Sequence, residues 1–160
     1  MSRIILFLDC DGVLNRSSTK ERLPSGHMGI DAELAARLAR ILEAHPSVEI
    51  VIASTWRRSR THWFEIWKGI GLHYKERWGG NTPVMDNKLD SGIWLAATRA
   101  DEIREWLRAN EDVTDYIILD DDTSIRAIPE LVPHWIQTDS YAGLSDADAD
   151  RAIRLLTPRK

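Results

Sequence analysis

The feature that most constrains the fold of this chain is an alternation of short aliphatic runs with longer segments whose apolar residues recur every three or four positions. Short unbroken aliphatic runs are typical of strands buried on both faces, and the longer segments are typical of helices with one buried face. Strands that alternate with helices in this way pair in parallel. The chain is therefore predicted to form an α/β fold with a Rossmann-like, doubly wound, mostly parallel sheet. The expected strands are residues 3–8, 48–53, 116–119 and a last short one at 134–138.

Capping and breaking residues indicate where the predicted helices begin and end. Side-chain oxygens just before an apolar stripe accept hydrogen bonds from the first N–H groups of a helix, whereas glycine and proline end one. The expected boundaries are Asp31 and His45-Pro46 for the first helix, Gly71 for the end of the second, a capping box of Thr98 with Asp101 for the third, and Ser145 for the fourth.

Two stretches carry weaker signals. Residues 16–29 are polar and are expected to form a loop, with a hairpin-like flap over the end of the first strand as one form that this loop could take. Residues 72–89 contain Gly79-Gly80 and Pro83, and they predict only a short strand at 81–85. Whether this second stretch contributes to a substrate pocket stays open at this point.

Length and composition indicate one ordinary globular domain over residues 1–160. The chain is 29% charged and 43% hydrophobic, with a net charge of −4, which provides no general attraction to nucleic acid or anionic membranes. Cys10 is the only cysteine, so no internal disulfide forms. We find no secretory signal, no apolar run of membrane-spanning length and no feature that calls for an obligate protein partner. These observations favour a cytoplasmic protein.

Three predicted strands end in polar side chains. If the strands are parallel, these groups lie at one edge of the sheet, where open α/β folds bind ligands. Clustered carboxylates need a cation, and an all-oxygen set favours Mg²⁺. A hydroxyl beside such a metal suits a phosphoryl group. The groups are Asp9 and Asp11 after the first strand, Ser54 and Thr55 after the strand at 48–53, and Asp120, Asp121 and Asp122 after the strand at 116–119.

The alternative to a functional site is an ordinary Asp-Gly turn after the first strand, with Gly12 allowing the chain to bend. That alternative explains one strand end by itself. It does not explain why polar chemistry follows three strands, so the coincidence favours a functional site.

With these residues in view, the chain resembles the haloacid dehalogenase-like (HAD) superfamily of hydrolases. The segment from Asp9 to Leu14 resembles the first family motif, Ser54 the second, and the run ending in Asp120-Asp121 the fourth. The stretch 98–122 and the segment 54–57 also resemble a small, nearly capless branch, the HAD domain of Swiss-army-knife RNA repair proteins. The resemblance implies a single domain with a minimal cap and an open site.

The resemblance also implies roles for individual residues. Asp9 would be the nucleophile that forms an aspartyl-phosphate, and Asp11 would protonate the leaving oxygen and then activate water. Ser54 would bind the phosphoryl oxygens. Mg²⁺ would be held by Asp9, the backbone carbonyl of Asp11, and Asp121 with Asp120 in support. An acid at position 11 points to phosphoryl transfer rather than carbon–halogen cleavage.

The third motif requires a cation near the start of the helix before the acidic pair. Arg99 is preferred to Lys88 on position, with a solvated helix cation as the alternative. The implied substrate is a phosphorylated small molecule or a nucleic-acid end. A non-catalytic binding module with the same fold is the third possibility, and the intact acidic set argues against it.

Several nearby residues have both a functional and a structural interpretation. Gly12, Thr55, Trp56 and Arg57 are candidate substrate-binding residues; Trp56 stacks a base or sugar in this view, or it belongs to the core. Asp122 either extends the acidic cluster or caps a turn. The core is expected to contain Trp63, Trp67 and Trp106, and Cys10 is expected to fill space between its neighbours rather than to act as a redox switch. A solvated helix start or a phosphate contact would explain Arg57, Arg58 and Arg60. Structural or surface positions are expected for His27, His45, His62, His73 and His134.

Overall fold

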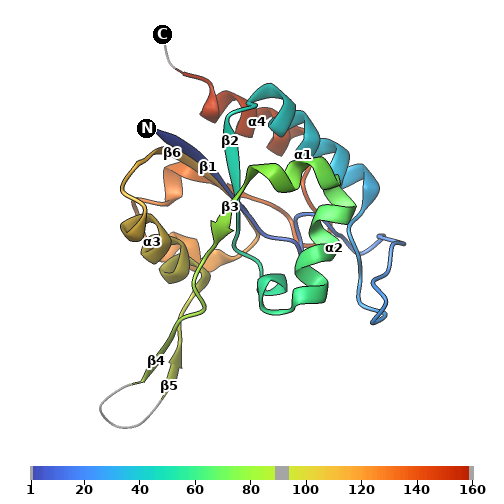
Figure 1. Cartoon of the computed structure of the whole chain (residues 1–160), viewed down its shortest axis with the longest axis horizontal. Coiled ribbons are helices and arrows are strands. Elements are labelled where there is room, and N and C mark those ends of the chain that lie inside the picture. The colour runs from blue at the N-terminus through green and yellow to red at the C-terminus, as the bar shows by residue number, and fades with distance from the viewer. Residues whose placement is uncertain (1, 89–93, 159–160) are drawn as a thin grey trace.

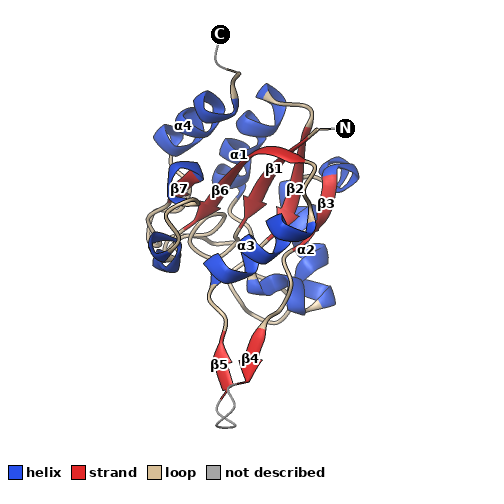
Figure 2. Ribbon diagram, turned by 90° about the vertical axis from the view of Figure 1, so that its left-hand side faces the viewer, coloured by secondary structure: helices blue, strands red, loops and turns tan. Residues whose placement is uncertain are grey.

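The computed structural model describes residues 2–88 and 94–158. A sheet of five parallel strands forms its centre, in the order β3-β2-β1-β6-β7 (Figures 1 and 2). This architecture confirms the predicted α/β fold. The strands are β1 (Arg3–Leu8), β2 (Val48–Ile52), β3 (Trp78–Asn81), β6 (Val113–Asp120) and β7 (Trp135–Gln137).

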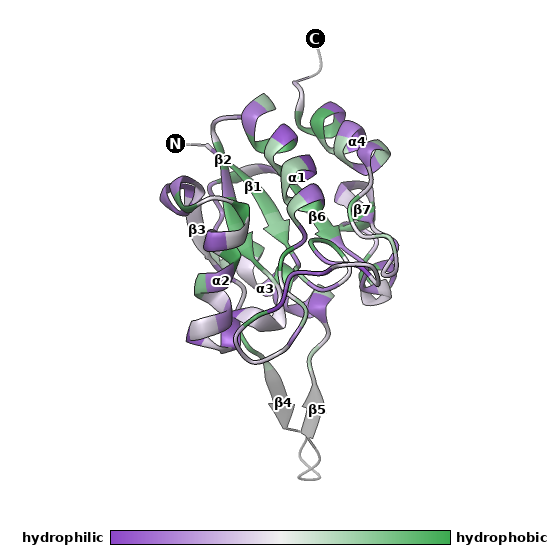
Figure 3. Cartoon of the chain, turned by 90° about the vertical axis from the view of Figure 1, so that its right-hand side faces the viewer, coloured by the Kyte–Doolittle hydropathy of each residue, from purple (hydrophilic) through white to green (hydrophobic). Residues whose placement is uncertain are grey.

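β1 lies in the middle of the sheet, hydrogen-bonded to β2 on one side and to β6 on the other. Its Leu6 and Leu8 side chains pack into one core, and Ile5 and Phe7 pack into a second core on the opposite face. A strand buried on both faces cannot alternate apolar with polar residues, which explains its continuous aliphatic sequence. Figure 3 shows the same pattern, with hydrophobic strands inside and hydrophilic residues on the surrounding helices.

Helices cover both faces of the sheet. α1 (Ala32–Ala44), α2 (Arg60–Ile70) and α4 (Asp146–Leu156) pack on one face, and α3 (Arg99–Ala109) packs on the other. Short 3₁₀ helices complete the connections: η1 (Thr55–Arg58), η2 (Leu72–Arg77), η3 (Thr123–Ala127) and η4 (Val132–His134).

The capping residues predicted from the sequence begin the helices. The Asp31 carboxylate accepts hydrogen bonds from the Glu33 and Leu34 N–H groups at the start of α1. Thr98 and Asp101 form a reciprocal capping box before α3, and Ser145 with Asp148 does the same before α4. Each box satisfies two backbone donors that have no partner inside the helix.

The predicted strand at 81–85 is wrong, since β3 ends where that strand was expected to begin. The Thr82 N–H still donates to the Ile52 carbonyl, but the next residue, Pro83, has no N–H to continue the ladder. β3 itself has the sequence Trp-Gly-Gly-Asn, which lacks the β-branched residues that indicate strands.

A two-stranded antiparallel hairpin, β4 (Asp86–Lys88) and β5 (Trp94–Ala96), follows β3 and was not predicted. Figures 1 and 2 show it as an arm that projects from the end of the molecule opposite the chain termini. Leu89, the last residue of the stretch left open above, lies outside the described residues. Within the described part of the chain, no helix is long and apolar enough to cross a membrane.

Candidate active site

Three carboxylates meet at the C-terminal edge of the sheet, because β1 and β6 are parallel neighbours. Asp9 follows β1 directly, Asp120 is the last residue of β6, and Asp121 comes next. One oxygen from each lies within 4.8 Å of the others. Asp9 is 5% exposed and Asp120 is fully buried, whereas Asp121 is half-buried at the surface of the cluster.

Arg99 brings a positive charge to the two buried acids. It is the first residue of α3, and its Nη1 lies 3.1 Å from Asp9 Oδ1 and 2.7 Å from Asp120 Oδ2. Burial by itself would lower the pKa of Arg99, but the two carboxylates raise it above its usual value, so the guanidinium stays charged. The structure thus brings Arg99 to the cluster. Lys88, the alternative cation, lies in β4, and its side chain is outside the described part of the structure.

The cluster is a group of carboxylates that could hold a metal ion. Burial raises the pKa of Asp9, and the nearby charge of Asp120 raises it further against the opposing effect of Arg99. Burial also raises the pKa of Asp120. One guanidinium therefore does not fully compensate three close carboxylates. An all-oxygen set of this kind matches the ligand preference of Mg²⁺.

Asp11, two residues after Asp9, points toward solvent and has a firmly held carboxylate. Its side chain is 48% exposed. Asn15 Nδ2 donates to Oδ1 over 2.8 Å, and the Trp56 indole N–H donates to Oδ2 over 3.1 Å. Asn15 is itself fixed, because its Oδ1 accepts the Gly12 N–H over 3.0 Å. These donors set the orientation of the Asp11 carboxylate.

Gly12 allows the acidic loops to approach each other closely. Its φ of +78° lies in the left-handed region, and a Cβ at this position would lie 2.7 Å from the Asp121 Cγ. Its carbonyl accepts a 2.7 Å hydrogen bond from Thr138 Oγ1, which ties the turn to the end of β7. Glycine here is required by both the backbone conformation and the space that Asp121 occupies.

The residues after β2 occupy three different environments. Ser54 is fully buried beside Cys10, and its Oγ accepts the Trp56 N–H as the cap of η1, while Thr55 is exposed. The Trp56 ring is only 3% exposed, so it offers no free face for stacking. Its contribution to the site is instead the N–H that reaches Asp11. Cys10 is a buried free thiol whose pKa is raised by burial.

Arg57 is not brought to the open site. Its side chain is 2% exposed and pairs with Glu102 over 2.7 Å. The guanidinium also donates to the carbonyls of Thr82, Pro83 and Ser54, and Glu102 accepts the Met85 N–H. Arg57 therefore joins η1 and α3 to the chain that leads into the β4–β5 arm. Arg58 and Arg60 are exposed.

A cavity of about 380 Å³ opens beside the acidic cluster. Its floor is formed by Asp11, Gly12 and Asp121. One wall is the flap at 16–29, where an isolated bridge joins Arg22 and Met28, and the other is the loop after β7. On the flap side the cavity is lined by Arg16, Ser17, His27 and Met28, together with Asn15 just before the flap. On the other side it is lined by Ser140 and Tyr141.

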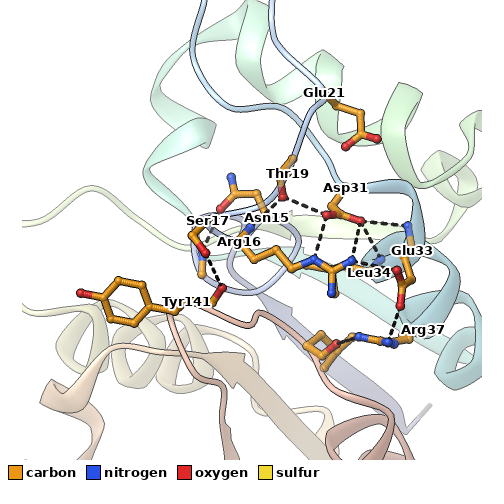
Figure 4. A network of polar contacts seen from close by, with 12 residues as sticks. Asn15, Arg16, Ser17, Thr19, Glu21, Asp31, Glu33, Leu34, Arg37 and Tyr141 are labelled. Atoms are coloured by element: carbon orange, nitrogen blue, oxygen red, sulfur yellow. Dashed lines mark hydrogen bonds and ion pairs between the residues drawn. The ribbon is translucent and has the colours of Figure 1, made fainter.

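The flap is anchored at its base and at its rim. Arg16 Nε lies 3.0 Å from Asp31 Oδ2, and Thr19 Oγ1 donates to the same oxygen over 2.9 Å (Figure 4). At the rim, the Ser17 N–H and hydroxyl both donate to the Tyr141 carbonyl. The two walls of the cavity are therefore bonded to each other.

Comparison with models of protein families matches residues 5–149 to the family described as the HAD domain in Swiss Army Knife RNA repair proteins. The matched stretch includes Asp9, Asp11, Arg99, Asp120 and Asp121. The chain belongs to this family. Comparisons of the chain with curated proteins and with solved structures give no match.

Membership in the HAD-domain family implies a hydrolase, and the acidic cluster could hold a metal ion.

The structure also resolves a choice that the sequence left open. Asp122 caps η3, because its Oδ1 accepts the Ser124 N–H over 2.8 Å, so it does not extend the HAD acidic cluster.

Three residues at this HAD site were missed by sequence reasoning. Asn15 and Tyr141 received no role, and His27 was assigned to structure or surface although its Nε2 lies 4.0 Å from Asp11 Oδ1. For Asn15, the spacing of four residues from Asp11 was an available signal. For His27 and Tyr141 the sequence contains no signal of a place at the site, because contacts between loops bring these residues to the cavity.

Proposed function

We propose that this protein is a Mg²⁺-dependent phosphohydrolase that acts through an aspartyl-phosphate on Asp9. The observation that carries the proposal is that two carboxylates separated by one residue lie in different environments. Asp9 is buried against Arg99 and the other acids, whereas Asp11 is half-exposed and faces the cavity. One suits attack on phosphorus inside a water-poor site, and the other suits proton exchange with a leaving group or water.

In the first step, an Asp9 oxygen attacks phosphorus and the bond from phosphorus to the ester oxygen breaks. Asp11 donates its proton to that oxygen, so the leaving group departs as a neutral alcohol. In the second step, water attacks the phosphorus of the aspartyl-phosphate while Asp11 takes back a proton. Inorganic phosphate leaves and Asp9 returns as a carboxylate. Arg99 provides a fixed positive charge that offsets the buried carboxylates and the transferred phosphoryl oxygens.

Asp9, Asp121 and the Asp11 backbone carbonyl would hold Mg²⁺, with Asp120 in support. The ion would supply positive charge to the phosphoryl oxygens and relieve repulsion among the acids. Ser54 and the turn at Gly12 would position the phosphoryl group. Ser54 is buried beside this edge of the sheet, and a serine hydroxyl can donate its proton while its oxygen accepts a capping hydrogen bond, here from the Trp56 N–H.

The test is hydrolysis of p-nitrophenyl phosphate with and without Mg²⁺ in the wild type, Asp9→Asn and Asp11→Asn. We expect metal-dependent turnover that falls by at least about 10²-fold in each variant, because each change removes a group that takes part in the chemistry. Wild-type-like turnover by Asp9→Asn would refute the covalent route. Lack of both turnover and Mg²⁺ binding in the wild type would instead favour a non-catalytic binding module.

A second candidate keeps the chemistry and places it on nucleic-acid ends. The family description names RNA repair proteins, and two exposed arginines follow β2: Arg58 at the end of η1 and Arg60 at the start of α2. Phosphate contacts by these residues would make oligonucleotide binding steeply salt-dependent. Oligonucleotide binding that is absent, or that does not change with salt, would remove this candidate.

A further inference from the structure

The cavity beside Asp11 has the right position to receive the part of the substrate that leaves. If Asp9 attacks phosphorus and Asp11 protonates the departing oxygen, as proposed above, the leaving group must extend past Asp11. The space on that side of Asp11 is the cavity between the flap and the loop after β7. The residues of its two walls therefore contact the leaving group rather than the phosphoryl group.

The charges that line this cavity disfavour a second anion. Asp11 and Asp121 contribute carboxylates to the floor. Arg16 is the lining residue with a permanent positive charge, and its guanidinium is paired with Asp31 and Glu33 over 3.0 and 2.9 Å (Figure 4). A leaving group with its own phosphate would thus find no unpaired permanent cation among the residues that line the cavity.

The rim of the cavity carries an aromatic ring on a rigid support. Tyr141 is 79% exposed, the highest value among the large apolar and aromatic side chains whose exposure the structure describes. Its backbone is nevertheless fixed, because its N–H donates to Asp139 Oδ1 over 2.8 Å and its carbonyl accepts from Ser17. Figure 4 shows the ring extending away from this anchor and from the polar network around Arg16.

The opposite wall contributes a second ring. His27 packs edge-on against Trp56 with ring centroids 5.6 Å apart, and its Nδ1 lies 2.7 Å from the Met28 carbonyl. A carbonyl only accepts hydrogen bonds, so the Nδ1 proton is used there and Nε2 remains toward Asp11. The cavity thus has a ring on each wall and carboxylates on its floor.

From these observations we propose that the cavity is a subsite for an uncharged alcohol that bears a planar ring, such as a nucleoside, and that Tyr141 stacks on that ring. The volume of about 380 Å³ is near the lower end for small-molecule sites, so it suits one planar ring system with its attached sugar. The substrate is then a small phosphate monoester with no second phosphate on the leaving group. This inference rests on the proposed phosphohydrolase activity.

The test compares kcat/KM for four esters in the full-length protein: adenosine monophosphate, glycerol phosphate, adenosine 3′,5′-bisphosphate and a 3′-phosphorylated oligonucleotide. We expect adenosine monophosphate to be the best substrate. The Tyr141→Ala variant should lose about tenfold or more in kcat/KM for adenosine monophosphate, mainly through KM, and should keep wild-type activity on glycerol phosphate. Tyr141→Phe retains the ring and should restore adenosine monophosphate turnover. Phe64→Ala removes a similarly exposed ring outside the cavity and is the matched control.

Two results would overturn the inference while leaving the phosphohydrolase intact. One is a preference for the bisphosphate or the oligonucleotide, which would contradict an uncharged leaving group. The other is an equal effect, or no effect, of Tyr141→Ala on the ring-bearing and ring-free esters. If the wild type hydrolyses none of the four esters or p-nitrophenyl phosphate, the proposed function fails and the inference fails with it.

Discussion

At the scale of single residues, the hydrogen bond from Trp56 to Asp11 predicts a catalytic effect that can be separated from packing. Trp56→Phe keeps most of the buried ring and removes the indole N–H that donates to Asp11 Oδ2. We expect kcat to fall about tenfold, since a misoriented general acid loses part of its roughly 10²- to 10⁴-fold contribution. Steady-state kinetics and the pH profile of kcat measure this change.

Trp67→Phe is the matched control for that change. Trp67 is also buried, but its Nε1 has no hydrogen-bond partner, so the loss of its indole N–H removes no hydrogen bond. Its kcat should equal the wild-type value. A wild-type kcat in Trp56→Phe as well would show that the indole N–H does not position Asp11.

The same scale contains a prediction about Gly12. Gly12→Ala places a methyl group against the Asp121 carboxylate in a residue with φ of +78°. The displaced carboxylate should weaken Mg²⁺ binding about tenfold or more, as measured by titration calorimetry. Gly26→Ala is the control, because Gly26 has a φ of +89° and nothing within 4 Å of the added methyl group. If both variants bind Mg²⁺ equally, backbone strain rather than the Asp121 contact explains any loss.

These residues also show how far the sequence allows a site to be predicted. Asp9, Asp120 and Asp121 were found because they lie at the ends of aliphatic runs, and parallel strands bring their ends to one edge. Tyr141 was missed because its place depends on a bond to Ser17, 124 positions away in the chain. A contact between two loops leaves no periodic pattern in either of them.

At the scale of elements, Asp31 joins the start of α1 to the flap, and its titration predicts a pH dependence of stability. Burial by itself would raise the pKa of Asp31, but hydrogen bonds from Thr19 and Arg16 outweigh it and lower the pKa. A carboxyl with a lowered folded pKa stabilises the fold above its unfolded pKa of about 3.9 and loses this effect as pH falls through the folded value.

Asp31→Ala should therefore reduce the free energy of unfolding by about 1–2 kcal/mol at pH 7. The difference from wild type should begin to shrink below about pH 4, where the unfolded carboxyl becomes protonated, and it should be lost as pH falls through the lower folded pKa. Urea denaturation at several pH values measures both effects. Ser59→Ala removes a neutral cap from α2, and its cost should not change with pH. A pH-independent cost for Asp31→Ala would contradict the assigned pKa.

Elements with strong local signals were predicted, and those held by their surroundings were not. α1, α3 and α4 begin at side chains that cap them in the way the sequence indicated. β3 contains two glycines and exists because β2 offers its free edge, so intrinsic preference argues against it. β4 and β5 have three residues each, which is too short for any periodicity to be visible.

At the scale of the whole molecule, the proposed metal site should link Mg²⁺ to global stability. The acidic cluster joins the ends of β1 and β6, which are central strands of the sheet, so a ligand that binds the cluster binds only the folded chain. At a Mg²⁺ concentration of about 100 times Kd, such binding stabilises the fold by about 2.7 kcal/mol. For a chain of this size we expect Tm to rise by roughly 5–10 °C.

Thermal unfolding with and without Mg²⁺ measures this shift, and two neighbouring acids provide the comparison. Asp121→Asn should abolish most of the rise in Tm, because Asp121 belongs to the cluster. Asp122→Asn should retain it, because Asp122 caps η3. The contrast matters more than the shift itself, since divalent cations also screen a chain with a net charge of −4. Equal shifts in both variants would show that Mg²⁺ acts through such screening and not through the cluster.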